Sequence, residues 1–377
     1  MKTYTYLLNN IRTSASMEVW SVATQAAIYD RDTVLCYATN SLQFPIESAI
    51  QSINRVLSLQ KSFKQRTAVA PPPLHSVKLG RMLFYEPRLS ADGSMSCASC
   101  HRQQNAFSDT SQFSIGIHGL PGKRQAMSAV NMLWNSNGYF WDGRAEKLRE
   151  QSLMPIEDEL EMDETVENVL QKLSSDTMYT NQFLRAFGTD QPSAHHLSLA
   201  LEQFMNSIVS YRSKYDQFLA GAATLTEQED RGRELFFAEY NPFFPEQSGA
   251  DCGHCHSGKT FDSPTYMNNG TDSLNTDFGR YEATGDSADI GLMKTVTLRN
   301  IALTPPYMHD GLFNTLEEVV QHYNTGLQNS ATLDGALEMT LQTGLMLSDQ
   351  DVADLVAFLH TLTDEELVTD ERYSSPF

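Results

Sequence analysis

Two short cysteine–histidine motifs are the part of this chain best suited to chemistry. Each is a Cys-x-x-Cys-His, with "CASCH" at residues 97–101 and "CGHCH" at residues 252–256. Each motif packs two thiols and one imidazole into five residues, so a single short turn can present all three groups to one partner. The second motif repeats the first with its histidine included, which indicates two sites of the same kind.

Three kinds of site use this pattern. A thioredoxin-like redox pair needs a strand–helix–strand context, and its histidine would not recur. A structural zinc site draws four ligands from paired Cys-x-x-Cys groups. In a c-type haem site, each thiol adds to a vinyl group and the histidine becomes an axial iron ligand. Two complete motifs in a chain of helical pattern favour two covalent haems, and the residues that would hold them are Cys97, Cys100 and His101, and Cys252, Cys255 and His256.

The overall composition narrows the class of protein. The chain has 377 residues, of which 41% are hydrophobic, enough for one large domain or two of ordinary size. The formal net charge is -20, and no basic stripe is present, so a nucleic-acid partner is not expected. No run of 18 or more apolar residues occurs, so no membrane span is expected. The fifth cysteine, Cys36, stands alone and is interpreted as an inert or unpaired thiol.

The elements that must position the two motifs are themselves repeated. "LGRMLF" (79–84) lies shortly before the first motif, and "RGRELF" (231–236) lies shortly before the second. The shared G-R-x-L-F at matching offsets predicts a duplicated unit.

Each unit also contains a later amphipathic helix. Apolar residues at helical spacing predict one helix over 195–221 and another over 347–362, with Ser348 as N-cap and Asp351 completing a capping box. Long loops rich in Gly, Asn, Pro and Asp, such as 261–291, would be implausible around an ordinary core but are expected around a haem. Strand signals are few. The predicted fold is therefore mostly α, with two tandem cytochrome c-like domains that each hold one covalent c-type haem.

The predicted domain boundaries follow this duplication. Residues 1–70 form an N-terminal extension and linker, 71–221 the first cytochrome c-like domain, and 222–377 the second. The stretch 68–76 is interpreted as a linker, and 44–63 as a helix that covers the first domain. The N-terminus lacks the apolar core of a secretory signal. Because c-type haem is ordinarily attached outside the cytoplasm, a periplasmic location is nevertheless expected.

The chain resembles the bacterial diheme cytochrome c peroxidase/MauG superfamily over roughly residues 75 to 362. The resemblance rests on the two Cys-x-x-Cys-His motifs and on other sequence blocks of the family, which lie between the motifs and after the second one. Those blocks are "FSD" (107–109), "GKRQAMSAVN" (122–131), "FWDGRAEKLREQSLMPIEDELEM" (140–162), "LRNIALTPPYMHDG" (298–311) and "DLVAFLHTL" (354–362).

For the first haem, the resemblance implies a peroxide-reactive site. His101 matches the proximal ligand, Glu161 the catalytic glutamate and Gln151 a distal-pocket glutamine, with Pro155 between them in the same block. Cleaving an O–O bond requires a group that moves a proton from the near oxygen to the far one. The alternative for Glu161 is an exposed charge in the acidic run "EDELEMDE". Its spacing of 20 residues from Trp141 agrees with the family pattern and favours the catalytic role.

For the second haem, the resemblance implies electron transfer. His256 matches its proximal ligand, and Trp141 matches a tryptophan between the haems that relays oxidising equivalents; the alternative for Trp141 is a core aromatic. Simple peroxidases generally place a methionine at the position of Tyr323, whereas a tyrosine there is the MauG-type choice. A phenolate favours electron-poor iron and lowers the reduction potential. Rival ligands are His322, Met308 and His309.

Two further family features match less closely. A distal histidine that leaves the first haem on reductive activation falls near His118, in a loop one residue out of step with the pattern. The family also holds a calcium ion between the haems with an asparagine side chain and two backbone carbonyls. Here the asparagine position is Gln125, and the carbonyl positions are Thr304 and Pro306; glutamine can still offer an oxygen.

The predicted function is peroxide-dependent oxidation of the MauG type. Hydrogen peroxide forms a high-valent iron state, and a residue on a partner protein is oxidised at long range. An alternative enzyme is a cytochrome c peroxidase that reduces hydrogen peroxide to water with electrons from a small cytochrome or copper protein. A non-catalytic diheme electron carrier is the alternative from another class, and the Glu161 and Gln151 pair argues against it.

Overall fold

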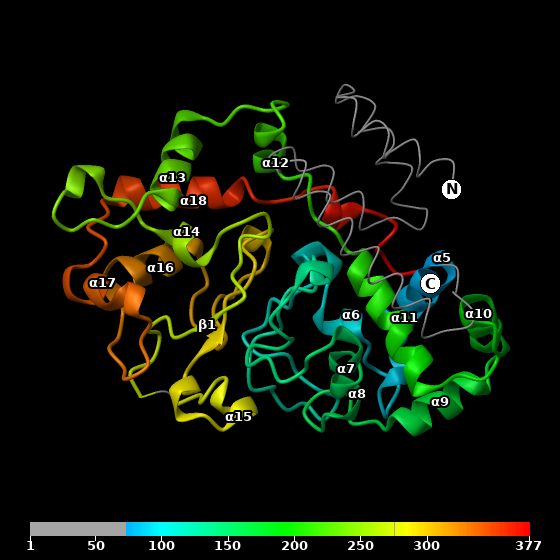
Figure 1. The fold of residues 1–377 in the computed structure, drawn as a ribbon. Coiled ribbons are helices and arrows are strands. Elements are labelled where there is room, and N and C mark those ends of the chain that lie inside the picture. Colours follow the sequence, from blue (N-terminus) through cyan, green and yellow to red (C-terminus); the bar gives the residue numbers. More distant parts are fainter. Residues whose placement is uncertain (1–72, 275) are drawn as a thin grey trace, which may run out of the picture.

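The computed structural model describes residues 73–377 except residue 275. The chain in this range forms two helical modules that lie side by side (Figure 1). The expected extension over 1–70, the helix over 44–63 and Cys36 lie outside the described residues. Within the described part, no helix combines the length and the apolar composition that crossing a bilayer requires.

The first module contains helices α5 to α11. Their bounds are α5 (Pro73–Phe84), α6 (Cys97–Cys100), α7 (Leu148–Gln151), α8 (Met154–Glu157), α9 (Val166–Ser174), α10 (Thr177–Phe187) and α11 (Ala194–Ser207). The one-turn helix α6 holds the two cysteines of the first haem motif.

The second module contains helices α12 to α18 and a two-stranded sheet. The helices are α12 (Lys214–Leu219), α13 (Glu227–Phe237), α14 (Cys252–Cys255), α15 (Tyr281–Thr284), α16 (Leu316–Gln321), α17 (Glu338–Thr343) and α18 (Asp349–His360). A π-helical turn follows α16 at His322–Gly326. Strands β1 (Tyr266–Met267) and β2 (Met293–Lys294) pair antiparallel, with Tyr266 opposite Lys294. The predicted mostly helical fold with few strands is confirmed.

The repeated G-R-x-L-F motif occupies the same place in both modules. It lies in α5, which packs on α11, and in α13, which packs on α18. A Cβ atom added to Gly80 would lie 1.9 Å from the Ala200 carbonyl oxygen, and one added to Gly232 would lie 1.8 Å from that of Asp354. The glycine of each motif therefore permits the close approach of its helix to the later helix of the same module.

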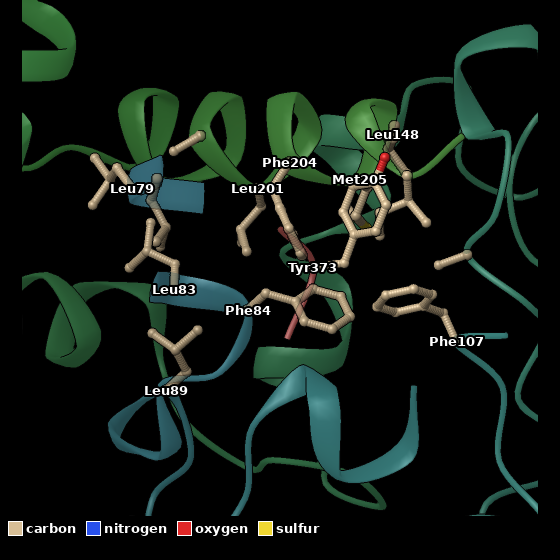
Figure 2. Packing of buried hydrophobic residues seen from close by; sticks show 14 of the residues in the cluster. Leu79, Leu83, Phe84, Leu89, Phe107, Leu148, Leu201, Phe204, Met205 and Tyr373 are labelled. Carbon is tan, nitrogen blue, oxygen red and sulfur yellow. The ribbon is translucent and has the colours of Figure 1, made fainter. Parts of the chain in front are cut away.

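The core of the first module is built from aromatic and leucine side chains (Figure 2). Phe84 meets Phe204 edge-on with ring centroids 5.2 Å apart, and Phe107 at 6.1 Å. Tyr373, from the C-terminal end of the chain, meets Phe107 edge-on at 6.4 Å. Such pairs stabilise the core beyond the area that they bury.

The helix predicted over 195–221 is interrupted. Helix α11 ends at Ser207 and α12 begins at Lys214. Between them, the backbone N–H groups of Tyr211 and Arg212 donate to the Asp364 carboxylate, at 3.0 and 3.1 Å, instead of continuing the helical ladder. The second predicted helix is confirmed: α18 begins after Ser348, whose side chain forms the capping box with Asp351. The linker expected over 68–76 gives way to α5 at Pro73.

The C-terminal tail joins the two modules. After α18 the chain leaves the second module and returns to the first (Figure 1). There the Gln103 side chain donates to the carbonyl oxygens of Leu367 and Asp370, at 3.0 and 2.8 Å, and Tyr373 is buried in the first core. The predicted domain boundary between residues 221 and 222 stays a prediction. The C-terminal tail, residues 361–377, follows the second module in sequence but packs against the first module.

Candidate active site

One continuous cavity of about 770 Å³ reaches both cysteine–histidine motifs. Its wall contains the cysteines and the final histidine of both motifs, namely Cys97, Cys100, His101, Cys252, Cys255 and His256. Strands β1 and β2 follow both motifs in the described chain, so neither motif has the strand–helix–strand context of a thioredoxin-like pair. No group of three or more His, Cys, Asp or Glu residues converges as a metal site among the described residues, so the paired cysteines do not form one zinc site there.

Both motif histidines are oriented as iron ligands are. The Nδ1 atom of His101 lies 2.9 Å from the Phe107 carbonyl oxygen, and that of His256 lies 3.2 Å from the Phe261 and 3.1 Å from the Val296 carbonyl oxygen. An Nδ1–H that donates to a carbonyl leaves Nε2 unprotonated and free for a metal. Burial lowers the pKa of both imidazoles, which keeps them neutral.

The motif cysteines lie in apolar surroundings. Burial raises the pKa of Cys97 and of Cys252 to about 12 and that of Cys255 to about 11. All four thiols are partly buried and line the cavity, where each pair can reach one edge of an apolar macrocycle. The cavity, the two oriented imidazoles and the apolar thiols together fit two haems.

Tyr323 lines the same cavity from the π-helical turn after α16. Its hydroxyl oxygen accepts a hydrogen bond from Asn269 Nδ2 at 3.2 Å, and the same nitrogen lies 3.2 Å from the Met308 sulfur. Burial raises the pKa of the Tyr323 phenol to about 12. Single π-helical turns occur often at functional sites, and this one carries Tyr323, which lines the cavity that His256 also lines.

The three rival candidates for the second haem iron differ in how they lie relative to the cavity. His322 is buried and absent from the cavity wall, and its Nε2 lies 3.0 Å from the Asn269 carbonyl oxygen. Met308 lies in the cavity wall beside Tyr323. His309 also lines the cavity, but its ring meets Trp141 edge-on, with centroids 6.4 Å apart. Tyr323 and Met308 therefore share one part of the cavity wall, and Tyr323 as ligand stays a prediction.

Three residues of the matched block line the cavity: Gln151 at the end of α7, Pro155 in α8 and Glu161 in the turn after α8. Glu161 is half-buried, and its pKa is raised to about 7, first by burial and then by the negative charge of Asp158. A carboxyl group with this pKa can both accept and donate a proton near neutral pH. In this arrangement Glu161 does not belong to a fully solvated acidic face.

A loop from the first module fixes the backbone of Glu161. The Ile117 N–H donates to the Glu161 carbonyl oxygen at 3.0 Å, and a Cβ atom at Gly116 would lie 2.0 Å from the Leu160 carbonyl oxygen. His118 follows on this loop but points outward. Its Nε2 pairs with the Asp163 carboxylate at 2.7 Å, and it is absent from the cavity wall.

Trp141 lies where the two modules meet. Its indole N–H donates to the Gln125 carbonyl oxygen at 2.8 Å, and its own carbonyl oxygen accepts the N–H of Lys294 from β2 at 2.8 Å. Nearby, Arg124 of the first module pairs with Asp277 of the second at 2.6 Å. The tryptophan is therefore held by both modules and lines the cavity between them.

The residues predicted to bind calcium belong to the wall of the same cavity. Gln125, Thr304 and Pro306 all line the cavity. The Gln125 side-chain nitrogen donates to Ser108 Oγ at 3.1 Å and to the Asp109 carbonyl oxygen at 3.0 Å. Calcium at this place stays a prediction.

Three cavity residues escaped the sequence analysis. Asn269, which donates to Tyr323, and Lys294, which binds the Trp141 segment, lie in stretches without a motif of their own. Arg144 lies inside the quoted "FWDGRAE" block; it lines the cavity and its positive charge partly offsets the raised pKa of Glu161. Of these three residues, only Arg144 lies within a block that matches the family, so only Arg144 carried a signal in the sequence.

Comparisons with known proteins place the chain in a family. The sequence profile described as di-haem cytochrome c peroxidase matches residues 75–224. A cytochrome c551 peroxidase of Nitrosomonas europaea is 32% identical over 315 residues, which cover 82% of this chain and 86% of the relative. The methylamine utilization protein MauG of Methylorubrum extorquens is 32% identical over 317 residues, which cover 82% of this chain and 85% of the relative.

Solved structures agree with these relatives. A MauG-like protein associated with microbial copper homeostasis has a TM-score of 0.72 and 34% identity, and the match covers 80% of this chain and 93% of that chain. The diheme peroxidase BthA from Burkholderia thailandensis has a TM-score of 0.66 at 24% identity, with 81% and 90% covered, and supports the fold alone.

Relatives named as peroxidases and relatives named MauG match this chain to the same degree, so the comparisons establish the family and leave its branch open. Membership implies two haems, hydrogen peroxide as oxidant and a redox partner. The chain belongs to the di-haem cytochrome c peroxidase/MauG family and is a haem-dependent oxidoreductase of the peroxidase type.

Proposed function

We propose that this protein uses hydrogen peroxide to oxidise a residue on a partner protein, as a MauG-like enzyme in the periplasm. The observation that carries this proposal is the position of Tyr323. Tyr323 lines the cavity that His256 also lines, whereas the neighbouring His322 does not line it and has its Nε2 3.0 Å from the Asn269 carbonyl oxygen. A phenolate ligand favours electron-poor iron, which suits an enzyme that must store oxidising equivalents.

The two haems, attached through Cys97 and Cys100 and through Cys252 and Cys255, supply the cleavage of the peroxide O–O bond and the storage of its oxidising equivalents. Glu161 accepts the proton of the near peroxide oxygen and returns it to the far oxygen, which leaves as water. Its pKa of about 7 permits both directions of transfer at neutral pH. The Gln151 side-chain amide, in the same wall, orients the peroxide by hydrogen bonding.

Trp141 provides the connection between the two sites. Its ring lies in the cavity wall, and hydrogen bonds to Gln125 and from Lys294 fix it against both modules. An indole that is held rigidly between two redox centres can relay an electron or a hole. In this proposal, oxidising equivalents that arise beside His101 reach the second module through Trp141, and the partner protein docks on the surface.

A cytochrome c peroxidase is the second candidate, and Met308 favours it. The Met308 sulfur lies 3.2 Å from the same Asn269 nitrogen that binds the Tyr323 hydroxyl group, so a thioether is close at hand for the second haem. A thioether favours reduced iron. With Met308 as ligand, the protein would reduce peroxide to water with electrons from a small redox protein.

Replacing Tyr323 by methionine tests the proposal. Spectroscopy of the native oxidised protein should show neither a methionine nor a histidine sixth ligand at the second haem. In Tyr323→Met the reduction potential of that haem should rise, because a thioether favours the reduced state. Tyr307→Phe is the matched control, since Tyr307 lines the same cavity while its hydroxyl group donates to the Ile301 carbonyl oxygen. A native methionine or histidine ligand would assign the protein to the peroxidase branch.

A further inference from the structure

Lys294 is a buried cation without a carboxylate partner. The residue is 7% exposed and lies on strand β2. No carboxylate forms an ion pair with its ammonium group among the described residues, and Asp262 acts on it only through its more distant charge. Burial lowers the pKa of Lys294 to about 8. A lysine is almost never fully buried unless it is paired, so this position calls for a counter-charge.

The ammonium group has three donors, and the protein uses two of them. One hydrogen bond goes to Asn135 Oδ1, and another goes to the Gly138 carbonyl oxygen at 2.6 Å. Both acceptors are uncharged and belong to the segment that leads to Trp141. Lys294 is also part of the cavity wall. The third donor is therefore available to an anion inside the cavity.

The contacts of the surrounding segment show that this is a built site. The backbone N–H of Lys294 donates to the Trp141 carbonyl oxygen at 2.8 Å, and the Tyr266 hydroxyl group, from the paired strand β1, donates to the Asn137 carbonyl oxygen. The ammonium group also lies 5.6 Å from the centre of the Tyr139 ring. Backbone and side-chain contacts therefore hold the charge at one place on the module boundary.

We propose that Lys294 binds a haem propionate, and that this carboxylate is its missing counter-charge. The propionates are the anionic groups of a haem, and a buried ammonium in the haem cavity gives one of them a charge-assisted hydrogen bond. Lys294 also binds the segment that contains Trp141. In this proposal it therefore connects a haem propionate to Trp141, which lies between the modules. The inference rests on haem occupying this cavity and is independent of the choice between the two branches.

The experiment measures the reduction potentials of both haems in the holoprotein, by redox titration followed by absorbance. Lys294→Met keeps the aliphatic stem and removes the charge, and Lys294→Gln keeps a donor without the charge. At least one haem should become easier to oxidise, because a nearby positive charge favours the reduced iron. We expect at least a tenfold change in its oxidised-to-reduced ratio at fixed potential, about 59 mV for a one-electron couple. Lys294→Arg should retain the native value.

Lys123→Met is the matched control, since Lys123 lines the same cavity but is exposed, so water screens its charge. Haem content is measured for every variant, and variants with two haems per chain are compared. Lys294→Met and Lys294→Gln proteins whose two potentials are both native, or shift no more than in Lys123→Met, would overturn the assignment. That result would leave the proposed oxidation chemistry untouched, because Glu161, Trp141 and Tyr323 remain in place.

Discussion

Glu161 is half-buried in the cavity wall and lies near two charged residues, Asp158 and Arg144. Its backbone is held by the Ile117 N–H, and burial raises its pKa to about 7. To begin the proton transfer, the carboxyl group must be deprotonated. The rate of reaction with peroxide should therefore rise with pH through about 7 and then level off.

Replacing Glu161 by glutamine should slow the reaction with peroxide by roughly 10²–10⁴-fold, the usual contribution of general acid–base catalysis. The pH dependence near 7 should vanish in the same variant, while both haems are retained. Stopped-flow absorbance over a range of pH measures both effects. Glu159→Gln is the control, because Glu159 is an exposed carboxylate in the same acidic run. A native rate in Glu161→Gln would remove Glu161 from the mechanism.

The sequence predicted some of these residues better than others, for physical reasons. The two motifs identify His101 and His256 because ligand spacing within five residues is a local property. The acidic run around Glu161 indicates a solvated face on its own, and only the family's spacing from Trp141 selected this carboxylate. Its burial depends on contacts with Gly116 and Ile117, more than 40 residues earlier in the chain. Lys294 carries no local signal, since its role depends on acceptors in the other module.

At the level of elements, the glycines of the repeated G-R-x-L-F motif set the distance between paired helices. A Cβ atom at Gly80 or at Gly232 would overlap a backbone carbonyl of the partner helix, which cannot move aside as a flexible side chain can. Overpacking of this kind typically costs about 1–3 kcal/mol. The same cost is expected in both modules, because each glycine meets its partner helix in the same way.

Gly80→Ala and Gly232→Ala should therefore each lower the free energy of unfolding by about 1–3 kcal/mol, although alanine is the better helix former. Denaturant titration followed by circular dichroism measures the loss. Gly335→Ala is the matched control, since no atom lies within 4 Å of its added Cβ. If both variants were as stable as Gly335→Ala, the two helix pairs would not depend on these glycines.

Helix boundaries show where local pattern is insufficient. The capping box at Ser348 predicted the start of α18, because the donor and acceptor lie three residues apart. The apolar spacing over 195–221 predicted one helix, but the chain breaks after Ser207. The N–H groups that leave the helix bind Asp364, about 150 residues further along the chain. No local pattern contains that acceptor.

At the scale of the whole molecule, the C-terminal tail connects the second module to the core behind the first haem motif. Tyr373 packs against Phe107, and its hydroxyl group donates to the Ser207 carbonyl oxygen at 2.8 Å. The Phe107 carbonyl oxygen in turn accepts the hydrogen bond of His101 Nδ1. A residue near the end of the described chain therefore supports the segment that orients His101, the proposed ligand of the first iron.

Tyr373→Ala should lower the free energy of unfolding of the first module by about 3–5 kcal/mol, as large-to-small changes of buried aromatic residues do. Denaturation followed at the absorbance of each haem separates the two modules. The absorbance change of the first haem should occur at a lower denaturant concentration than in the native protein. Phe377→Ala, at a side chain that is 64% exposed, is the control and should have little effect. Equal stability of the two variants would contradict the supporting role of the tail.

The central claim is that Tyr323 and His256 hold the second haem ready for oxidation while the first haem remains open to peroxide. The most direct test is the absorption spectrum of the fully oxidised protein before and after one equivalent of hydrogen peroxide, with no reductant present. We expect one high-spin and one low-spin haem at the start, and a rapid change in both when peroxide is added. A protein that stays inert until one haem is reduced, with a methionine or histidine as sixth ligand of the second haem, would contradict it.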